Sequence, residues 1–416
     1  MTPSLKDRKT QECRRSEQVQ RVTGAPSLNA NTIGLAVAFI VAALFLLWRC
    51  LLSPGFGGEE PWGLAAALRF HLGDRPLVDS WDTNFSSAIL ALPFLKGYLA
   101  TVGSTEGILL AFRSVFYTAV VATALAMTVC LRGTLSRLSA VSMGLLILFY
   151  MPFLAPYVGK AADYHAHMLS ALTAVCLHRS APRVALANLI PGVLSGIAVI
   201  GNPPTITVVP FFVWALVRAY PEPHRRRSAV WGYLLGGIGV GVVFLLSLLM
   251  LSGRDLFLHF NHVMSPDDHD FSLLAFLGRL SEGAWLLAIP ILIGVLAGAI
   301  SAGGRYKPDG RVSFWAMVVA MASGFYLAAS DTIVGPVMPQ SLVFVVGASL
   351  LLTDRLTRTT RLTATQLLLL LPAIGAGLGW FLGSNGGVFS FALASPLILG
   401  AAVASWESDT SDSRDS

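Results

Sequence analysis

Residues 108–131 read ILLAFRSVFYTAVVATALAMTVCL, and this stretch decides the class of fold. The run is almost wholly apolar and is long enough to cross a hydrocarbon core of about 30 Å as an α-helix. It holds one charged side chain, Arg113, while Glu106 precedes the run and Arg132 follows it. An acid at one end and a base at the other predict a membrane span with a defined direction.

Similar apolar runs recur along the whole chain. Of the 416 residues, 54% are hydrophobic and only 12% are charged, with a mean hydropathy of +0.67, which excludes a soluble protein. No run shows the strict alternation of a membrane β-strand. We therefore predict an all-α polytopic membrane protein of about 12 transmembrane helices. The expected spans are 33–51, 108–131, 138–158, 162–178, 184–200, 205–219, 230–251, 284–302, 312–329, 333–352, 364–382 and 388–404.

Acidic and basic side chains occupy alternate loops between these runs. One set of loops holds Arg132, Arg137, Arg179, Arg183, Arg218, Arg225, Arg226, Arg227, Arg305, Lys307, Arg311, Arg355, Arg358 and Arg361. The other set holds Glu59, Glu60, Asp74, Asp79, Asp82, Glu106, Asp163, Asp255, Asp267, Asp268, Asp270, Glu282 and Asp331. The positive-inside rule places the Arg loops in the cytoplasm and the acids outside, in the plasma (inner) membrane. This orientation accounts for the net charge of +6 without nucleic acid.

The same rule fixes the expected topology. Residues 86–102 are apolar, but a span there would reverse every later loop, so we expect a helix lying in, or re-entering, the outer interface. Residues 31–405 then form one transmembrane domain, with 1–30 and 406–416 as disordered cytoplasmic tails. Two outer loops are long, 52–107 and 253–283, and long loops in a compact architecture are usually functional.

Glycine and cysteine add two further expectations. The pairs Gly192/Gly196, Gly232/Gly236 and Gly237/Gly241 lie inside spans at small-xxx-small spacing, which predicts close helix packing and not a nucleotide-binding loop. The four cysteines lie in the first tail or in and beside the spans, so an external disulfide framework is not expected.

The first outer loop contains GGEEPWGLAAALRFHLGDRPLVDSWDTNF, residues 57–85. Pro61, preceded by two glutamates, predicts the start of a short helix that ends at Leu72. The helix dipole favours the ionised form of a carboxylate at such a start, so Glu59 or Glu60 could serve as a base. The alternative is that both merely cap the helix.

This loop resembles that of the GT-C glycosyltransferases, especially the branch of aminoarabinose transferases, protein O-mannosyltransferases and related actinobacterial proteins. The resemblance rests on the acidic pair Glu59-Glu60, the turn Gly73-Asp74-Arg75-Pro76, a later acid at Asp79 or Asp82, and the interfacial helix at 86–102. Residues 192–210 look like the middle hairpin of two short spans in that family. The chain departs from the family in having Glu-Glu where Asp-Glu is commoner, and in lacking a Lys-Pro-Pro run.

The resemblance implies sugar transfer from a polyprenyl-phosphate donor to an acceptor at the outer face. One carboxylate would deprotonate the acceptor hydroxyl, and cations would hold the departing phosphate. The candidate bases are Glu60, Glu59, Asp82 and Asp79. The candidate phosphate-binding cations are Arg75, Arg113, Arg254, Arg279 and Lys160. The alternative is that Arg113 pairs with Glu106 and that the others are plain surface charges.

The second long loop offers a metal site as an alternative feature. Its ligand candidates for Mg²⁺ or Mn²⁺ are Asp267, Asp268, Asp270, His259 and His262, although a solvated turn explains them better and we favour a mechanism without metal. Asp163, His165 and His167 form a second polar cluster. Two other functions remain open: an exporter of a small hydrophobic product, and a membrane prenyl-diphosphate enzyme using the Asp267–Asp270 cluster.

Overall fold

The structure is a computed structural model that describes residues 30–48, 51, 60–80, 85–150, 158–180, 188–256, 291–296, 299, 362–383 and 395–407. Every regular element within these ranges is a helix, and the only β-type pairing there is an isolated bridge between Pro76 and Ser80. The prediction of an all-α protein is confirmed for this part of the chain.

Within the described ranges, four helices are long and apolar enough to cross a membrane by length and composition: Phe85–Val102, Ile108–Leu131, Pro223–Ser252 and Ala364–Leu382. The expected total of about 12 spans exceeds what the described ranges can test. Of the predicted spans, 312–329 and 333–352 and most of 284–302 lie outside the described residues, as do nearly all of both tails.

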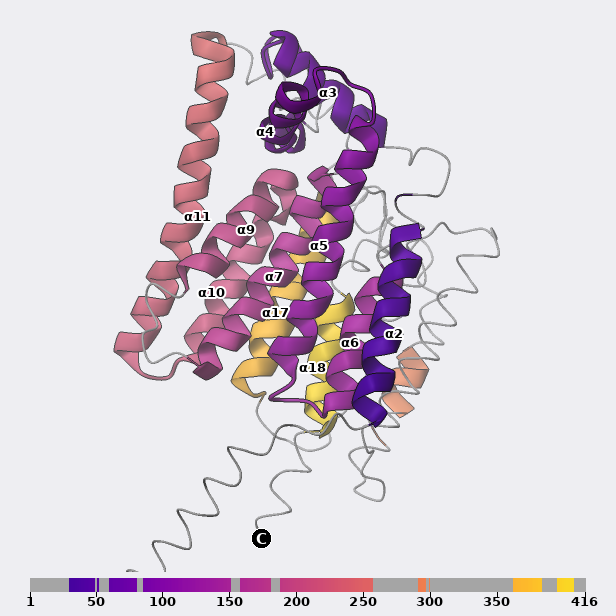
Figure 1. The fold of residues 1–416 in the computed structure, drawn as a ribbon. Helices are drawn as coiled ribbons and strands as arrows, with labels where there is room; N and C mark the ends of the chain where they lie inside the picture. The colour runs from indigo at the N-terminus through magenta and orange to yellow at the C-terminus, as the bar shows by residue number, and fades with distance from the viewer. Residues whose placement is uncertain are drawn as a thin grey trace, which may run out of the picture. The chain divides into compact units, whose positions relative to one another are not determined.

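The helices match the apolar runs closely where both are defined (Figure 1). They are α2 (Ala30–Leu47), α3 (Glu60–Leu72), α4 (Phe85–Val102), α5 (Ile108–Leu131), α6 (Arg137–Tyr150), α7 (Val158–Ser180), α9 (Leu189–Gly201), α10 (Val208–Ala219), α11 (Pro223–Ser252), α17 (Ala364–Gly383) and α18 (Ser395–Glu407). Short 3₁₀ turns, η3 (Pro203–Thr207) and η4 (Gly253–Asp255), follow α9 and α11. The chain divides into two compact units, Met1–Val41 and Ala42–Ser416, and the elements from α3 onward all belong to the second.

The described basic segments of the second unit, which follow α5, α7 and α10, lie at one end of its helical bundle. Arg179, in the last turn of α7, donates to the carbonyl of Cys130 at 3.0 Å and to the Thr134 hydroxyl at 3.2 Å. This places a guanidinium at the carbonyl end of α5, where the helix dipole favours a cation. The same end holds a disulfide between Cys130 and Cys176, whose Cα atoms are 5.3 Å apart, and a ring contact between His178 and Tyr220.

Described acidic side chains lie at the opposite end. Asp163, near the start of α7, bonds to Asn202 after α9 and to Trp380 near the end of α17. Successive helices therefore run antiparallel, and the described loops that the sequence predicted to be basic lie at the end opposite to the turn and η4 that carry Asp74, Asp79 and Asp255. Glu222, paired with Arg225, is a described acid at the basic end.

Helix α4 differs from its neighbours in direction. In Figure 1 it is seen nearly along its own axis, whereas α5, α7 and α11 run up the picture. It packs against α3 and against α7 and α9. Its length and composition would suit a span, but its direction is crosswise to the helices that it contacts.

Glycines bring α9 and α11 into backbone contact. A Cβ added to Gly236 would lie 2.3 Å from the carbonyl oxygen of Leu189, and one added to Gly192 would lie 2.0 Å from that of Tyr233. Gly196 is similarly crowded by Gly237. The predicted role in helix packing is confirmed for Gly192, Gly196 and Gly236, and it is wrong for Gly241, because nothing lies within 4 Å of a Cβ added there.

A second contact of this kind was not predicted. Gly375 and Gly379 of α17 face the backbone of η3 and the start of α10, and Thr207 donates to the carbonyl of Gly375 at 2.6 Å. The hairpin of the short helices α9 and α10 is therefore held on one side by α11 and on the other by α17.

A substitution on α11 tests this packing. Gly236→Leu should destabilise the protein by about 1–3 kcal/mol, because the new side chain would overlap the α9 backbone. Gly241→Leu is the matched control, since nothing lies within 4 Å of its Cβ position. The check is thermal unfolding of both variants in the same detergent; equal losses would contradict close packing at Gly236.

Candidate functional site

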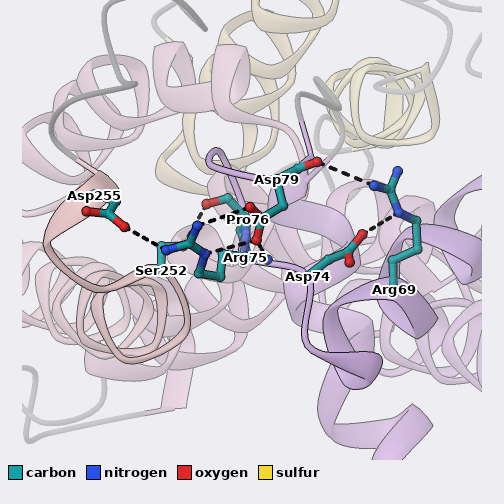
Figure 2. A network of polar contacts seen from close by, with 7 residues as sticks. All are labelled: Arg69, Asp74, Arg75, Pro76, Asp79, Ser252 and Asp255. Carbon is teal, nitrogen blue, oxygen red and sulfur yellow. Dashed lines mark hydrogen bonds and ion pairs between the residues drawn. The ribbon is translucent and has the colours of Figure 1, made fainter.

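The connection between α3 and α4 contains a tight turn that presents several charged groups (Figure 2). Gly73 has φ 113°, a conformation that glycine adopts without strain, and the amide of Asp74 donates to the carbonyl of Arg69 at 3.0 Å. Leu77 follows at φ 62° and is buried, so its side chain anchors the turn in the apolar cluster beneath it. The turn is thus rigidly placed although its charges face outward.

Arg75 is the centre of the network. Its amide and its Nε both donate to Asp79 Oδ2 at 2.9 Å, and one terminal nitrogen donates to Asp79 Oδ1 at 3.1 Å. The other terminal nitrogen donates to Asp255 at 2.6 Å. Arg69 donates to Asp74 at 2.6 Å and lies beside the same group. One guanidinium therefore joins the turn after α3 to η4, at the end of α11.

The link to α11 is also made inside the apolar cluster. The buried Ser252 hydroxyl donates to the carbonyl of Pro76 at 2.6 Å. Leu248 and Leu256 pack in one cluster with Leu77 and with the buried faces of α3 and α4. Helix α3, the turn and α4 consequently form one packed layer at the acidic end of the second unit, and the end of α11 packs against this layer.

These bonds change what Arg75 and Asp79 can do chemically. Hydrogen bonds from Arg75 hold the pKa of the Asp79 carboxyl below its usual range, and the bonds to Asp79 and Asp255 raise the pKa of Arg75. A carboxylate with a lowered pKa is a weaker base. A guanidinium that already binds two carboxylates is a poorer phosphate ligand, so this pair is better suited to holding the turn in place.

A second polar group lies within the bundle, near its acidic end. The carboxylate of Asp163 is buried, and its Oδ2 accepts from Asn202 Nδ2 at 3.1 Å and from the Trp380 indole at 2.7 Å. His167, one turn further along α7, lies edge-on to Trp380 with ring centroids 5.0 Å apart. His165 contacts Phe116 and Thr123 of α5 instead. Helices α7 and α17 and the residue after α9 thus contribute side chains to one polar cluster in the interior. Ionisable side chains at such positions mark function by default.

The remaining predicted residues are placed only in part. Arg113 is buried in the second turn of α5. Glu60 is the first residue of α3, Lys160 lies in the first turn of α7, and Arg254 lies in η4. The side chains of these three residues are outside the described set. Glu59, Asp82, Arg279, His259, His262, Asp267, Asp268 and Asp270 lie outside the described residues altogether. No group of three potential metal ligands occurs in the part of the chain that the structure describes.

The long-range partners in both groups were not predicted from the sequence. Asp255 lies 180 positions from Arg75, and Trp380 lies 217 positions from Asp163, and no local spacing signals such pairs. Asn202 was accessible to inference, because an amide directly before two prolines ends a helix where a polar side chain can turn inward.

Comparisons of the chain with protein-family models, with curated proteins and with solved structures gave no match.

The Arg75–Asp79 pair predicts a pH response of the turn. Because the pKa of Asp79 is lowered on folding, its contribution is present above the ordinary value near 3.8 and is lost only as the pH falls below it. Amide exchange across residues 73–80 should stay slow at pH 5–7 in the native protein. Asp79→Asn should accelerate it severalfold at pH 7.

Asp74→Asn is the control, because it removes a bond to Arg69 and leaves all bonds of Arg75 in place. Hydrogen–deuterium exchange with peptide-level mass spectrometry provides the measurement. Slow exchange in Asp79→Asn would show that the turn does not depend on this ion pair.

Proposed function

We propose that this chain is a GT-C-type membrane glycosyltransferase that moves a sugar from a polyprenyl-phosphate donor to an acceptor at the outer membrane face. The observation that supports this proposal best is the layer formed by α3, the turn and α4. It packs across the acidic end of the second unit, on α7 and α9, and is tied to α11 through Arg75 and Ser252. A crosswise α4 in this layer suits an interfacial helix next to a lipid substrate.

The geometry also ranks the candidate residues. Asp79 is engaged by Arg75, which makes Glu60, with Glu59 and Asp82, the better candidate for the base. Glu60 opens α3, where the helix dipole supports an ionised carboxylate. Arg113, Lys160, Arg254 and Arg279 stay as candidates for holding the donor phosphate in the proposed reaction. The partners are the bilayer and the lipid-linked sugar, and no metal is required.

An exporter is the second candidate function, and one observation favours it. Asp163, His165 and His167 are buried in the bundle, and ionisable groups at such positions commonly line a substrate or proton pathway. Transfer of label from a radioactive polyprenyl-phosphate sugar to an acceptor in purified proteoliposomes separates the two functions, because an exporter would move its substrate without cleaving it.

Orientation is tested by thiol labelling at exposed positions. With the acidic end outside, Ser104→Cys should react with an impermeant maleimide on intact cells, and His224→Cys should react only after permeabilisation. Ser104 and His224 lie at opposite ends of the second unit. The unsubstituted protein controls for Cys13 and Cys50. Labelling of His224→Cys from outside would reverse the orientation, and would also place the Cys130–Cys176 disulfide on the side where disulfides normally persist.

The base is tested by a carboxylate-to-amide change. Glu60→Gln keeps size and hydrogen bonding but removes basicity, which should lower the rate of sugar transfer by about 10²–10⁴-fold. Glu106→Gln is the control, because Glu106 is an exposed acid that precedes α5 in the same predicted outer loop. Rates are measured in membranes that hold equal amounts of each variant. Wild-type transfer by a Glu59→Gln/Glu60→Gln double variant would move the base to Asp82 or remove the enzyme interpretation.

A further inference from the structure

The hydrogen bond of His167 determines where its lone pair lies. Its Nδ1 is 3.3 Å from the backbone carbonyl oxygen of Asp163. A carbonyl oxygen can only accept, so Nδ1 carries the hydrogen and Nε2 is left as an acceptor. The side chain is 1% exposed, and Nε2 has no hydrogen-bond partner among the described residues.

His165 has the same tautomer by the same reasoning. Its Nδ1 lies 3.1 Å from the Thr123 hydroxyl, whose own hydrogen is donated to the carbonyl of Ala119 at 2.8 Å. Nδ1 of His165 is therefore the donor, and its buried Nε2 is likewise an acceptor without a described partner. Two positions along a helix differ by about 200° in direction, so the two imidazoles face different sides of α7.

The side of His167 carries described polar groups beyond the partner of its Nδ1. There the Asp163 carboxylate, the amide of Asn202 and the indole of Trp380 are joined by hydrogen bonds of 3.1 and 2.7 Å. On the side of His165, the described ring contact is with Phe116. Leaving a buried acceptor without a donor costs about 1–3 kcal/mol of stability. A donor from outside the described side chains would remove this cost at Nε2 of His167.

We infer that His167 Nε2 accepts a hydrogen bond from a sugar hydroxyl of the substrate, in a site that it shares with Asp163 and Trp380. The inference rests on the proposed function and names the residues that bind its sugar. A hydroxyl supplies the donor that Nε2 needs. An ionised phosphodiester has no hydrogen to donate to Nε2, so the group bound here is the sugar and not the phosphate. The site lies where α4 packs over α7 and α9, next to the layer proposed to meet the lipid.

The test uses two substitutions that separate the ring nitrogens of His167. Asparagine places a polar group near the Nδ1 position and removes the acceptor at the Nε2 position, whereas glutamine keeps an acceptor near Nε2. The probes are farnesyl phosphate and farnesyl phosphate linked to mannose, glucose, galactose or arabinose, together with the four free sugars. Affinities are measured on the full chain in nanodiscs, and the gain due to the sugar is the ratio of the two lipid affinities.

The native protein should bind at least one sugar-bearing probe more tightly than farnesyl phosphate. His167→Asn should reduce this gain by roughly 3- to 10-fold, the equivalent of one hydrogen bond, while leaving farnesyl phosphate affinity unchanged. His167→Gln should retain most of the gain. His165→Asn is the matched control, with equal burial on the other side of α7, and should retain it fully.

Each other outcome has a defined meaning. If His167→Asn retains the full gain in affinity due to the sugar, the inference is overturned and the proposed function is unaffected. A lower unfolding temperature of that variant would then assign an ordered water to Nε2. Binding of a free sugar that depends on His167, without binding of any lipid-linked probe, supports the inference and removes the transferase. If the native protein binds neither the lipid-linked sugars more tightly than farnesyl phosphate nor any free sugar, both the inference and the proposed function are overturned.

Discussion

The exclusion of water from the hydrocarbon core is the constraint on which this structure depends. A backbone crossing that region must satisfy its own hydrogen bonds, which leaves helices as the available element for a chain of this composition. Charges must then gather at the helix ends or be paired inside. Among the described residues the structure meets both demands: the arginines of the basic loops lie at one end of the second unit, the carboxylates of the turn after α3 and of η4 lie at the other, and the buried Asp163 accepts two hydrogen bonds.

Both ends use this segregation to join helices. At the basic end, Arg179 binds the carbonyl terminus of α5 and the adjacent loop. At the acidic end, Arg75 is the reverse case, a cation among carboxylates, and it joins the turn after α3 to η4. Its bonds leave Asp79 poorly suited to catalysis, so a motif that resembles a catalytic one in sequence has a positioning role in this geometry.

Close packing completes the framework. Within hydrocarbon there is no hydrophobic force between helices, so association depends on van der Waals contact and on polar bonds. The glycines of α9 and α11 allow such contact along one side of the α9–α10 hairpin, and Gly375 and Gly379 allow it along the other. The hairpin fixes Asn202 beside Asp163, which brings the polar group of α7 to the end of the bundle where α4 lies.

The sequence alone determined the helical class, the bounds of most described helices and the separation of charge, because hydropathy and the placement of arginines follow directly from the solvent. It also predicted the helix that ends at Leu72 and the packing role of Gly192, Gly196 and Gly236. The sequence predicted a helix lying in or re-entering the interface at 86–102, and the structure places α4 crosswise to the helices that it contacts. Only the tertiary structure showed that Arg75 bonds to Asp255 and that Trp380 bonds to Asp163. These contacts join residues far apart along the chain, and local spacing carries no information about which helix ends will meet.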